Sequence, residues 1–116
     1  MPIVNTYFTK EKHLVQLEGM TPDLKTYVAE QLTCKDITLN SGEVSVRLIK
    51  ALGEGMLADI EMAVAAAPYQ ERVDRQDEIC LNIREFVLNH IEGLEDAKVW
   101  LALSELVHSW EEPATS

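Results

Sequence analysis

The chain opens with Pro2-Ile3-Val4-Asn5-Thr6-Tyr7-Phe8, an apolar run that begins with proline. β-Branched and aromatic side chains are typical of strands, and a proline at the first position need not donate a hydrogen bond to a neighbour. The run therefore predicts a strand with Pro2 at its tip. Methionine aminopeptidases readily remove Met before a small residue such as Pro, so we expect a mature chain that begins with a secondary amine. Such an amine can act as a base. The alternative is that Pro2 only starts the strand.

Three later stretches also have the composition of strands. Residues 44–49 alternate apolar and polar side chains behind a turn at 40–42. Residues 57–67 alternate in the same way and stop at Pro68, since proline is unsuited to a strand interior. Residues 98–103, Lys-Val-Trp-Leu-Ala-Leu, form the last run. The sequence therefore predicts four strands.

Two helices are expected between these strands. Thr21 is a suitable N-cap and Pro22 a suitable first residue for a helix over about residues 22–33. A longer apolar stripe predicts a second helix over residues 70–91. Residues 9–19 are charged and are expected to form a short helix or a turn-rich segment.

The expected elements fall into two halves with the same plan. Residues 45–48 occupy in the first half the place that residues 98–101 occupy in the second, which indicates an internal pseudo-repeat. Two consecutive βαβ units with right-handed crossovers predict an α/β fold, one four-stranded sheet with two helices on one face. We expect a single domain over residues 1–112 and a frayed tail over 113–116.

The face of the sheet that is not covered by helices carries several small or apolar side chains. A solvated sheet face normally carries polar residues. We therefore expect this face to pack against other subunits. The residues concerned are Ile49, Ala51, Ala63, Ala65, Trp100 and Ala102.

Composition limits the functions that the chain can have. Its 116 residues, 47% of them hydrophobic, are enough for one domain with a real core and too few for two. A net charge of -10 makes nucleic acid or an anionic membrane surface an unfavourable partner, although a small anion can still bind locally. Neither a secretion signal nor a membrane span is indicated, so the expected location is the cytoplasm.

Motifs for metals and cofactors are missing from the sequence. His13, His90 and His108 lack the spacing of metal ligands, and no glycine-rich phosphate-binding motif or nucleophile elbow is present. Cys34 and Cys80 stand alone and are interpreted as ordinary thiols. We expect neither a metal nor a cofactor.

The order of these features resembles that of the tautomerase superfamily. The resemblance rests on the Met-Pro start of a strand, the Val44-Ser45-Val46-Arg47-Leu48-Ile49 strand, and a second βαβ unit without a proline of its own. The superfamily includes 4-oxalocrotonate tautomerase, macrophage migration inhibitory factor and 5-carboxymethyl-2-hydroxymuconate isomerase. Residues 2–6 are similar to the opening of the inhibitory-factor branch, whereas length and layout are closest to the hydroxymuconate isomerase branch. The resemblance spans nearly the whole chain.

The resemblance implies a homotrimer with a pocket around the N-terminal proline. In the family, the free proline nitrogen takes a proton from a carbon next to a carbonyl and returns it elsewhere, without a cofactor. Pro2 matches this base. Arg47 matches the arginine of the family's Ser-Val-Arg strand motif, and its planar fork suits a carboxylate. The alternative for Arg47 is an ion pair with one of the acidic residues.

Two arginines near the start of the second expected helix are weaker candidates for substrate binding. Arg72 and Arg75 lie close to a helix N-terminus, which favours anions. The alternative is that they are solvated partners of Glu71 and Asp74.

Two aromatic residues complete the candidate site. Tyr69 could orient a substrate, and Trp100 could help to dry the pocket around the proline. Many family members also carry an arginine after the first strand, where this chain has Lys10 and Lys12. Lysine supplies charge without the fork, which weakens the expectation of a dicarboxylate substrate.

The resemblance therefore implies an isomerase that moves a proton in a small unsaturated 2-keto or 2-hydroxy acid, with a small anion as its substrate. In the same fold, a protonated proline would act as a general acid in a decarboxylase or dehalogenase, with Asp59, Glu61 or Glu105 as candidates for activating water. A different class of function is a trimer with an inactive pocket that binds a small molecule or a protein.

Overall fold

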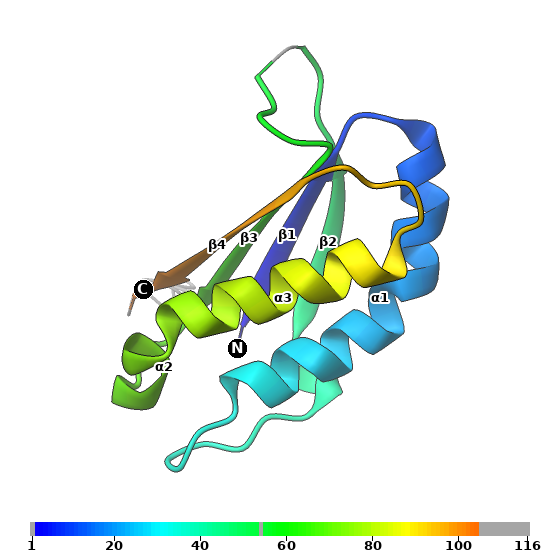
Figure 1. Cartoon of the computed structure of the whole chain (residues 1–116). Coiled ribbons are helices and arrows are strands. Elements are labelled where there is room, and N and C mark those ends of the chain that lie inside the picture. Colours follow the sequence, from blue (N-terminus) through cyan, green and yellow to red (C-terminus); the bar gives the residue numbers. More distant parts are fainter. Residues whose placement is uncertain (1, 54, 105–116) are drawn as a thin grey trace, which may run out of the picture.

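The computed structural model describes residues 2–53 and 55–104 and contains a four-stranded sheet with helices packed on it (Figure 1). In chain order the elements are β1 (Ile3–Phe8), α1 (Glu11–Leu32), the 3-10 turn η1 (Ser41–Glu43), β2 (Ser45–Lys50), β3 (Ile60–Ala66), α2 (Gln70–Asp74), α3 (Gln76–His90) and β4 (Ala97–Leu103). The four strands occupy the expected stretches.

The sheet has the strand order β2-β1-β3-β4. β1 pairs with β2 in parallel, β3 pairs with β4 in parallel, and the two central strands β1 and β3 run antiparallel. Each parallel pair is joined by a helical crossover, so the fold consists of two βαβ units side by side. The predicted α/β fold class is confirmed, and its layout is consistent with a tautomerase-like fold.

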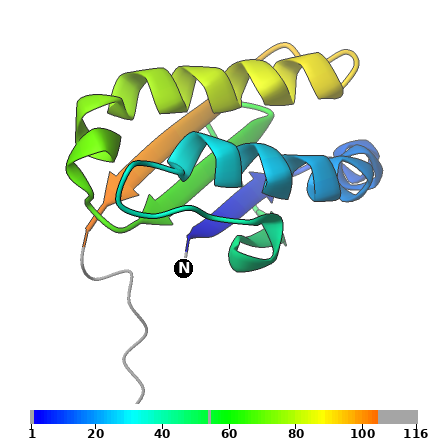
Figure 2. The same ribbon diagram turned by 90° about the horizontal axis from the view of Figure 1, so that it is seen from below.

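The helices cover one face of the sheet and leave the other uncovered, as Figure 2 shows. Along β1, Val4, Thr6 and Phe8 are buried beneath the helices, whereas the residues between them are only partly buried. Alternation of this kind is the rule for a strand with one covered face. The core is formed by this face and by the apolar stripes of α1 and α3. Its largest fully buried side chains include Leu17, Leu24, Leu32, Ile60, Met62, Ile79 and Ile83.

The first helix differs from the sequence-based prediction. α1 begins at Glu11, not at Pro22, and Pro22 lies in its interior. Leu17, Met20 and Leu24 are buried on both sides of the proline, so packing against the sheet holds the helix together where its local sequence favours a break. α1 changes direction near its middle in Figure 1, as expected for a helix with an internal proline.

The second helix is also divided differently from the prediction. The expected single helix over 70–91 consists of α2 and α3, which are separated at Arg75. Arg75 has φ -108° and ψ 14°, outside the helical region. The short α2 thereby turns away from the line of α3, as seen at the green end of the helix in Figure 1.

The predicted start of the third strand was too early. β3 begins at Ile60, because the backbone N–H groups of Leu57 and Ala58 are hydrogen-bonded to the Glu61 carboxylate instead of a neighbouring strand.

The domain boundary predicted at residue 112 and the tail at 113–116 lie outside the described residues. Among the helices of the described part, none is long and apolar enough to cross a membrane.

Candidate functional site

Pro2 lies directly before β1, at one end of a central strand of the sheet. Its carbonyl oxygen accepts a hydrogen bond from the Ser45 N–H at 3.0 Å, which ties it to the start of β2. The antiparallel register that pairs Ile3 with Ala65 brings Pro2 beside the end of β3. Pro2 is buried. By strand alternation its ring belongs to the helix-covered face, together with Val4.

Arg47 lies on the uncovered face of β2, away from Pro2. It is exposed and stands in register with Asn5 of β1. Pro2 and Asn5 are three positions apart, which is about 10 Å along a strand. Arg47 and Pro2 also belong to opposite faces of the sheet. The two principal candidates are therefore not brought together within one chain.

Arg72 is buried and bonded to the backbone. Its Nε donates to the Leu32 carbonyl at 2.8 Å and its Nη1 to the Ala67 carbonyl at 3.0 Å. Its guanidinium carbon lies 4.9 Å from the centre of the Tyr69 ring. Burial lowers the pKa of Arg72, against smaller opposing effects of Cys34 and Tyr69. The alternative that Arg72 is a solvated partner of Glu71 and Asp74 is wrong, and its role in substrate binding stays a prediction.

Tyr69 and Arg75 flank this buried arginine. Tyr69 precedes α2 and lies at the same end of the sheet as Pro2, since Ala67 follows the last residue of β3. Arg75 forms an exposed ion pair with Glu78, at 3.0 Å between Nε and Oε2, and not with Glu71 or Asp74. Of the two arginines, only Arg75 is accessible from solvent to a substantial extent.

Trp100 lies on β4, at the opposite edge of the sheet from Arg47. Through the strand register, the uncovered face carries a row that runs from Arg47 through Asn5 and Ala63 to Trp100. Three strand spacings of about 4.8 Å put about 14 Å between the two ends of this row. Trp100 is 47% exposed. The Asn5 Oδ1 atom is buried and has no hydrogen-bond partner among the described residues.

Five of the six residues expected on this face lie there. The strand register places Ile49, Ala63, Ala65, Trp100 and Ala102 on it, and Ile3 joins them. The sixth, Ala51, lies just beyond the end of β2. No element of residues 2–53 or 55–104 covers these side chains in Figure 2.

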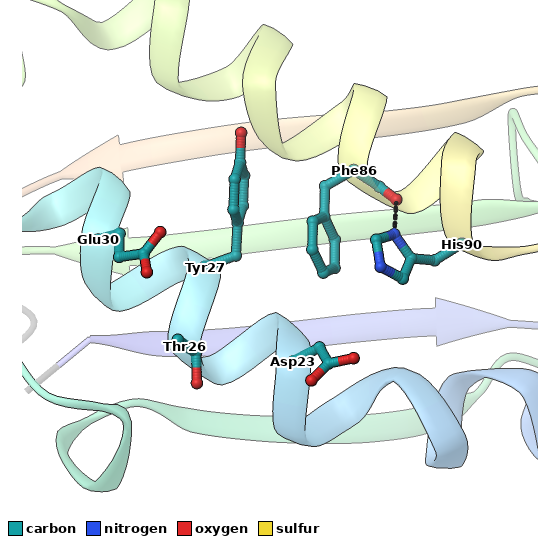
Figure 3. Close-up of a pocket in the computed structure, with 6 residues that line it drawn as sticks. All are labelled: Asp23, Thr26, Tyr27, Glu30, Phe86 and His90. Atoms are coloured by element: carbon teal, nitrogen blue, oxygen red, sulfur yellow. Dashed lines mark hydrogen bonds between the residues drawn. The ribbon is translucent and has the colours of Figure 1, made fainter.

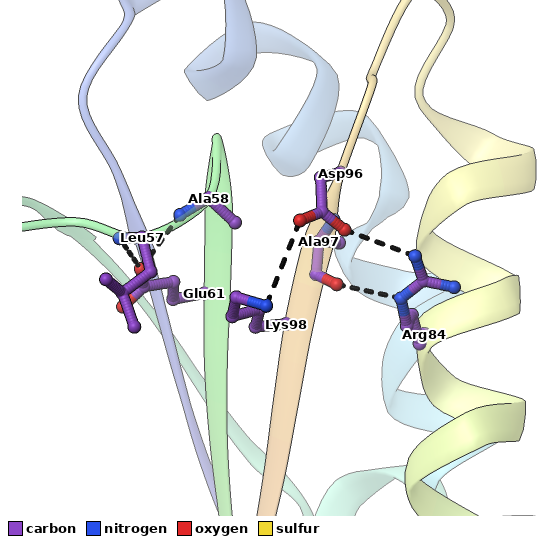
Figure 4. Close-up of polar contacts among 7 residues, drawn as sticks. All are labelled: Leu57, Ala58, Glu61, Arg84, Asp96, Ala97 and Lys98. Carbon is purple, nitrogen blue, oxygen red and sulfur yellow. Dashed lines mark hydrogen bonds and ion pairs between the residues drawn. The ribbon is translucent and has the colours of Figure 1, made fainter.

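The acidic residues considered for water activation are held at the far end of the sheet from Pro2. Glu61 accepts hydrogen bonds from the backbone N–H groups of Leu57 and Ala58 (Figure 4). Asp59 lies 3.8 Å from the Lys10 ammonium nitrogen. Glu105 lies outside the described residues. The described part of the chain also contains no group of three or more His, Cys, Asp or Glu side chains that could hold a metal ion.

Two hollows of the surface were not anticipated from the sequence. One lies between α1 and α3, beside a stack of the Tyr27, Phe86 and His90 rings (Figure 3).

The second hollow lies at the β4 edge of the sheet. It is lined by Arg84, Asp96, Ala97, Lys98, Val99 and Trp100. In the second hollow the Arg84 Nε donates to the Ala97 carbonyl at 2.9 Å, and its Nη2 lies 3.1 Å from Asp96 (Figure 4). The pKa of Asp96 is lowered, mainly by this hydrogen bond from Arg84.

Helical periodicity was the one signal that pointed to the first hollow. Tyr27 and Phe86 are partly buried at the edges of their apolar stripes, where α1 and α3 meet. Which residue of one helix faces which residue of the other could not be inferred without the sheet that places both helices.

Comparisons with known proteins provide no assignment. No family model and no curated protein matches the chain. Among solved structures, a domain of unknown function (DUF1904) from Sebaldella termitidis is similar over 96% of both chains, with a TM-score of 0.48 and 11% sequence identity.

Proposed function

We propose that this protein is a cofactor-independent tautomerase that moves a proton in a small unsaturated 2-keto or 2-hydroxy acid in the cytoplasm. Pro2 is the proposed base, after removal of Met1. The observation that carries the proposal is the position of Pro2, buried at the start of a central strand in a sheet of two βαβ units. Burial disfavours an ammonium ion, so a free amine there keeps its lone pair available for a proton.

The reaction needs only proton transfer. The Pro2 nitrogen takes a proton either from the enol hydroxyl or from the carbon beside the carbonyl, which leaves a dienolate. The protonated nitrogen then returns the proton to a carbon of the dienolate that did not carry it before. The atoms balance without an oxidant or a metal. A cation that binds the substrate carboxylate lowers the energy of the dienolate.

Arg47 is the proposed cation, supplied to the pocket by a neighbouring copy. Within one chain it lies on the other face of the sheet from Pro2, so a single subunit does not complete the site. The uncovered face carries Ile3, Ala63 and Ala65 near the Asn5 Oδ1 atom, which is buried without a hydrogen-bond partner in residues 2–53 and 55–104. These features support association through this surface. A homotrimer, as the family resemblance implies, is the assembly that we propose.

The test combines the intact mass of untagged protein with an ultraviolet assay of 2-hydroxymuconate and phenylenolpyruvate ketonisation. We expect loss of Met1 and measurable turnover. Pro2→Ala is expected to reduce kcat by at least about 100-fold. Arg47→Gln is expected to reduce kcat/KM by about tenfold or more. The control is Lys50→Gln, which removes an exposed cation at the end of β2 far from Pro2 and should leave kcat/KM unchanged. Unchanged turnover in Pro2→Ala would refute the mechanism.

The second candidate is a trimer that binds a small molecule or a protein with an inactive pocket. The hydrogen bonds of Arg72 to backbone carbonyls favour this candidate, because two donors of an arginine at the Pro2 end of the sheet are then not free for a substrate. Retained Met1, no turnover and a trimer in sedimentation would support this candidate. A stable monomer would contradict both. A decarboxylase or dehalogenase is less favoured, since Asp59 and Glu61 are engaged at the far end of the sheet.

A further inference from the structure

β4 is an outer strand of the sheet, and its backbone groups alternate between the β3 side and the outer edge. The Ser104 N–H bonds to the Ala66 carbonyl of β3 at 3.1 Å, which fixes the direction of this alternation. The N–H and C=O groups of Ala97, Val99 and Leu101 therefore point away from β3. Open backbone groups along a strand edge are where another chain can pair with a sheet.

Side chains of α3 and of the residue before β4 bond to these outward groups. The Gln76 Nε2 donates to the Leu101 carbonyl at 2.7 Å. The Arg84 Nε donates to the Ala97 carbonyl at 2.9 Å (Figure 4). The Ala97 N–H donates to the Asp96 Oδ1 at 2.9 Å, and the Arg84 Nη2 lies 3.1 Å from the same oxygen. Both outward groups of Ala97 therefore have side-chain partners.

Cys80 lies between Gln76 and Arg84 on α3 and supplies a further contact with the edge. Burial raises the pKa of its thiol, as does Asp77, whereas a hydrogen bond with the Leu101 backbone lowers it. A hydrogen bond lowers the pKa of a thiol when the sulfur is the acceptor, so the donor is the Leu101 N–H. Both outward groups of Leu101 therefore also have side-chain partners.

The spacing of helix and strand allows one helix to serve this edge. Gln76 and Arg84 are eight positions apart, which is about 12 Å along a helix. Their partners Leu101 and Ala97 are four positions apart, which is about 13 Å along a strand. Val99 lies midway, beside the hollow of about 310 Å³ at the β4 edge. Its outward N–H and C=O groups have no hydrogen-bond partner within residues 2–53 and 55–104.

We propose that α3 takes the place of a fifth strand and closes the β4 edge against antiparallel pairing with β4 of a second copy of this chain. A symmetric pair centred on Val99 would need the outward groups of Ala97 and Leu101, which α3 and Asp96 occupy. The composition of β4 would otherwise favour such a pair, because valine, tryptophan and leucine suit a strand and no like charges would lie opposite each other. Association of the protein is thereby directed to other surfaces, such as the uncovered face of the sheet.

Sedimentation velocity of the double variant Gln76→Ala/Arg84→Ala tests the proposal. Removal of both donors frees two backbone carbonyls, so we expect species larger than the wild-type assembly at concentrations about tenfold or more below those at which the wild type forms them. Circular dichroism at the same concentrations distinguishes association of folded chains from unfolding. A folded double variant that sediments like the wild type would overturn the proposal.

The matched control is Gln70→Ala/Arg75→Ala. It removes the same two residue types from side-chain contacts away from β4, so it should sediment like the wild type. Val99→Pro, added to the double variant, deletes the central outward N–H without removing a bond to β3 and should restore the wild-type mass. Association that persists after this change, or that also occurs in the control, would overturn the proposal.

Amide exchange of the wild-type protein, followed by nuclear magnetic resonance, tests the closure without any substitution. We expect the Val99 amide to exchange about tenfold or more faster than those of Ala97 and Leu101, because only the latter two have partners. Equal protection of the three amides would overturn the proposal, since the edge would then be covered by something other than α3. Neither experiment depends on tautomerase activity.

Discussion

Replacement of Arg72 by methionine tests how the ends of three elements are held together. Arg72 is 3% exposed and joins α2 to the last residue of α1 and to the segment after β3. Methionine keeps much of the aliphatic stem but removes both hydrogen bonds and the contact with the Tyr69 ring. The change therefore leaves the Leu32 and Ala67 carbonyl oxygens without these donors.

The expected loss follows from these contacts. A hydrogen bond from a charged donor contributes about 1.5–3 kcal/mol, so two bonds give a gross loss of about 3–6 kcal/mol. The desolvation of the guanidinium, which also lowers the pKa of Arg72, offsets part of this loss. We expect the free energy of unfolding to fall by about 2–4 kcal/mol. Arg75→Met is the matched control, with an expected loss of at most about 1 kcal/mol, since its ion pair is exposed.

Urea unfolding followed by circular dichroism measures both variants at one protein concentration, because unfolding of an oligomer depends on concentration. The urea concentration at half unfolding should fall much further in Arg72→Met than in Arg75→Met. Equal shifts of this midpoint from the wild-type value would refute the reasoning. A stable Arg72→Met variant with reduced turnover would instead support the predicted role of Arg72 in substrate binding.

Four further substitutions test other local features by the same unfolding assay. Burial lowers the pKa of His13, so the folded state binds fewer protons than the unfolded state and stability is lost as the pH falls below about 6.5. His13→Leu should remove this part of the pH dependence, and an unchanged decline in stability between about pH 7.5 and 5 would contradict the explanation. Pro22→Ala restores an N–H inside α1 and should stabilise the protein by about 1–3 kcal/mol, whereas destabilisation would show that the bend is required. Gly93 has φ +78°, and within the described residues, apart from its two chain neighbours, no atom lies within 4 Å of the position that a Cβ would take there. Gly93→Ala should therefore destabilise by about 1 kcal/mol through backbone strain, while Gly19→Ala inside α1 should stabilise by about 0.5–1 kcal/mol.

The fold was largely predictable because strand and helix periodicities are local properties. All four strands lie in the expected stretches, since alternation of apolar side chains identifies a strand with one covered face. The helix boundaries were less accurate. Thr21-Pro22 has the sequence of a helix start, but the Thr21 hydroxyl bonds to the Leu17 carbonyl in the middle of α1 at 2.8 Å. Burial of the same stripe on both sides outweighs the local signal.

The candidate site was predictable in composition but not in arrangement. Pro2 was expected at the tip of a strand and lies there. Arg47 was expected on a strand, but its separation from Pro2 depends on the register between β1 and β2, which no local pattern specifies. Arg72 and Arg75 are three residues apart and look equivalent in the sequence, yet one is buried against carbonyl groups and the other pairs with Glu78 in solvent.

By itself, the sequence determined the four strands, the two βαβ units and the group of small and apolar side chains on the uncovered face. These properties follow from the order of residues within each element. Only the tertiary structure decided the pairing of Tyr27 with Phe86, the burial of Arg72 and the faces on which Pro2 and Arg47 lie. The physical reason is that such contacts join residues far apart in the chain, and their geometry depends on strand register and helix packing.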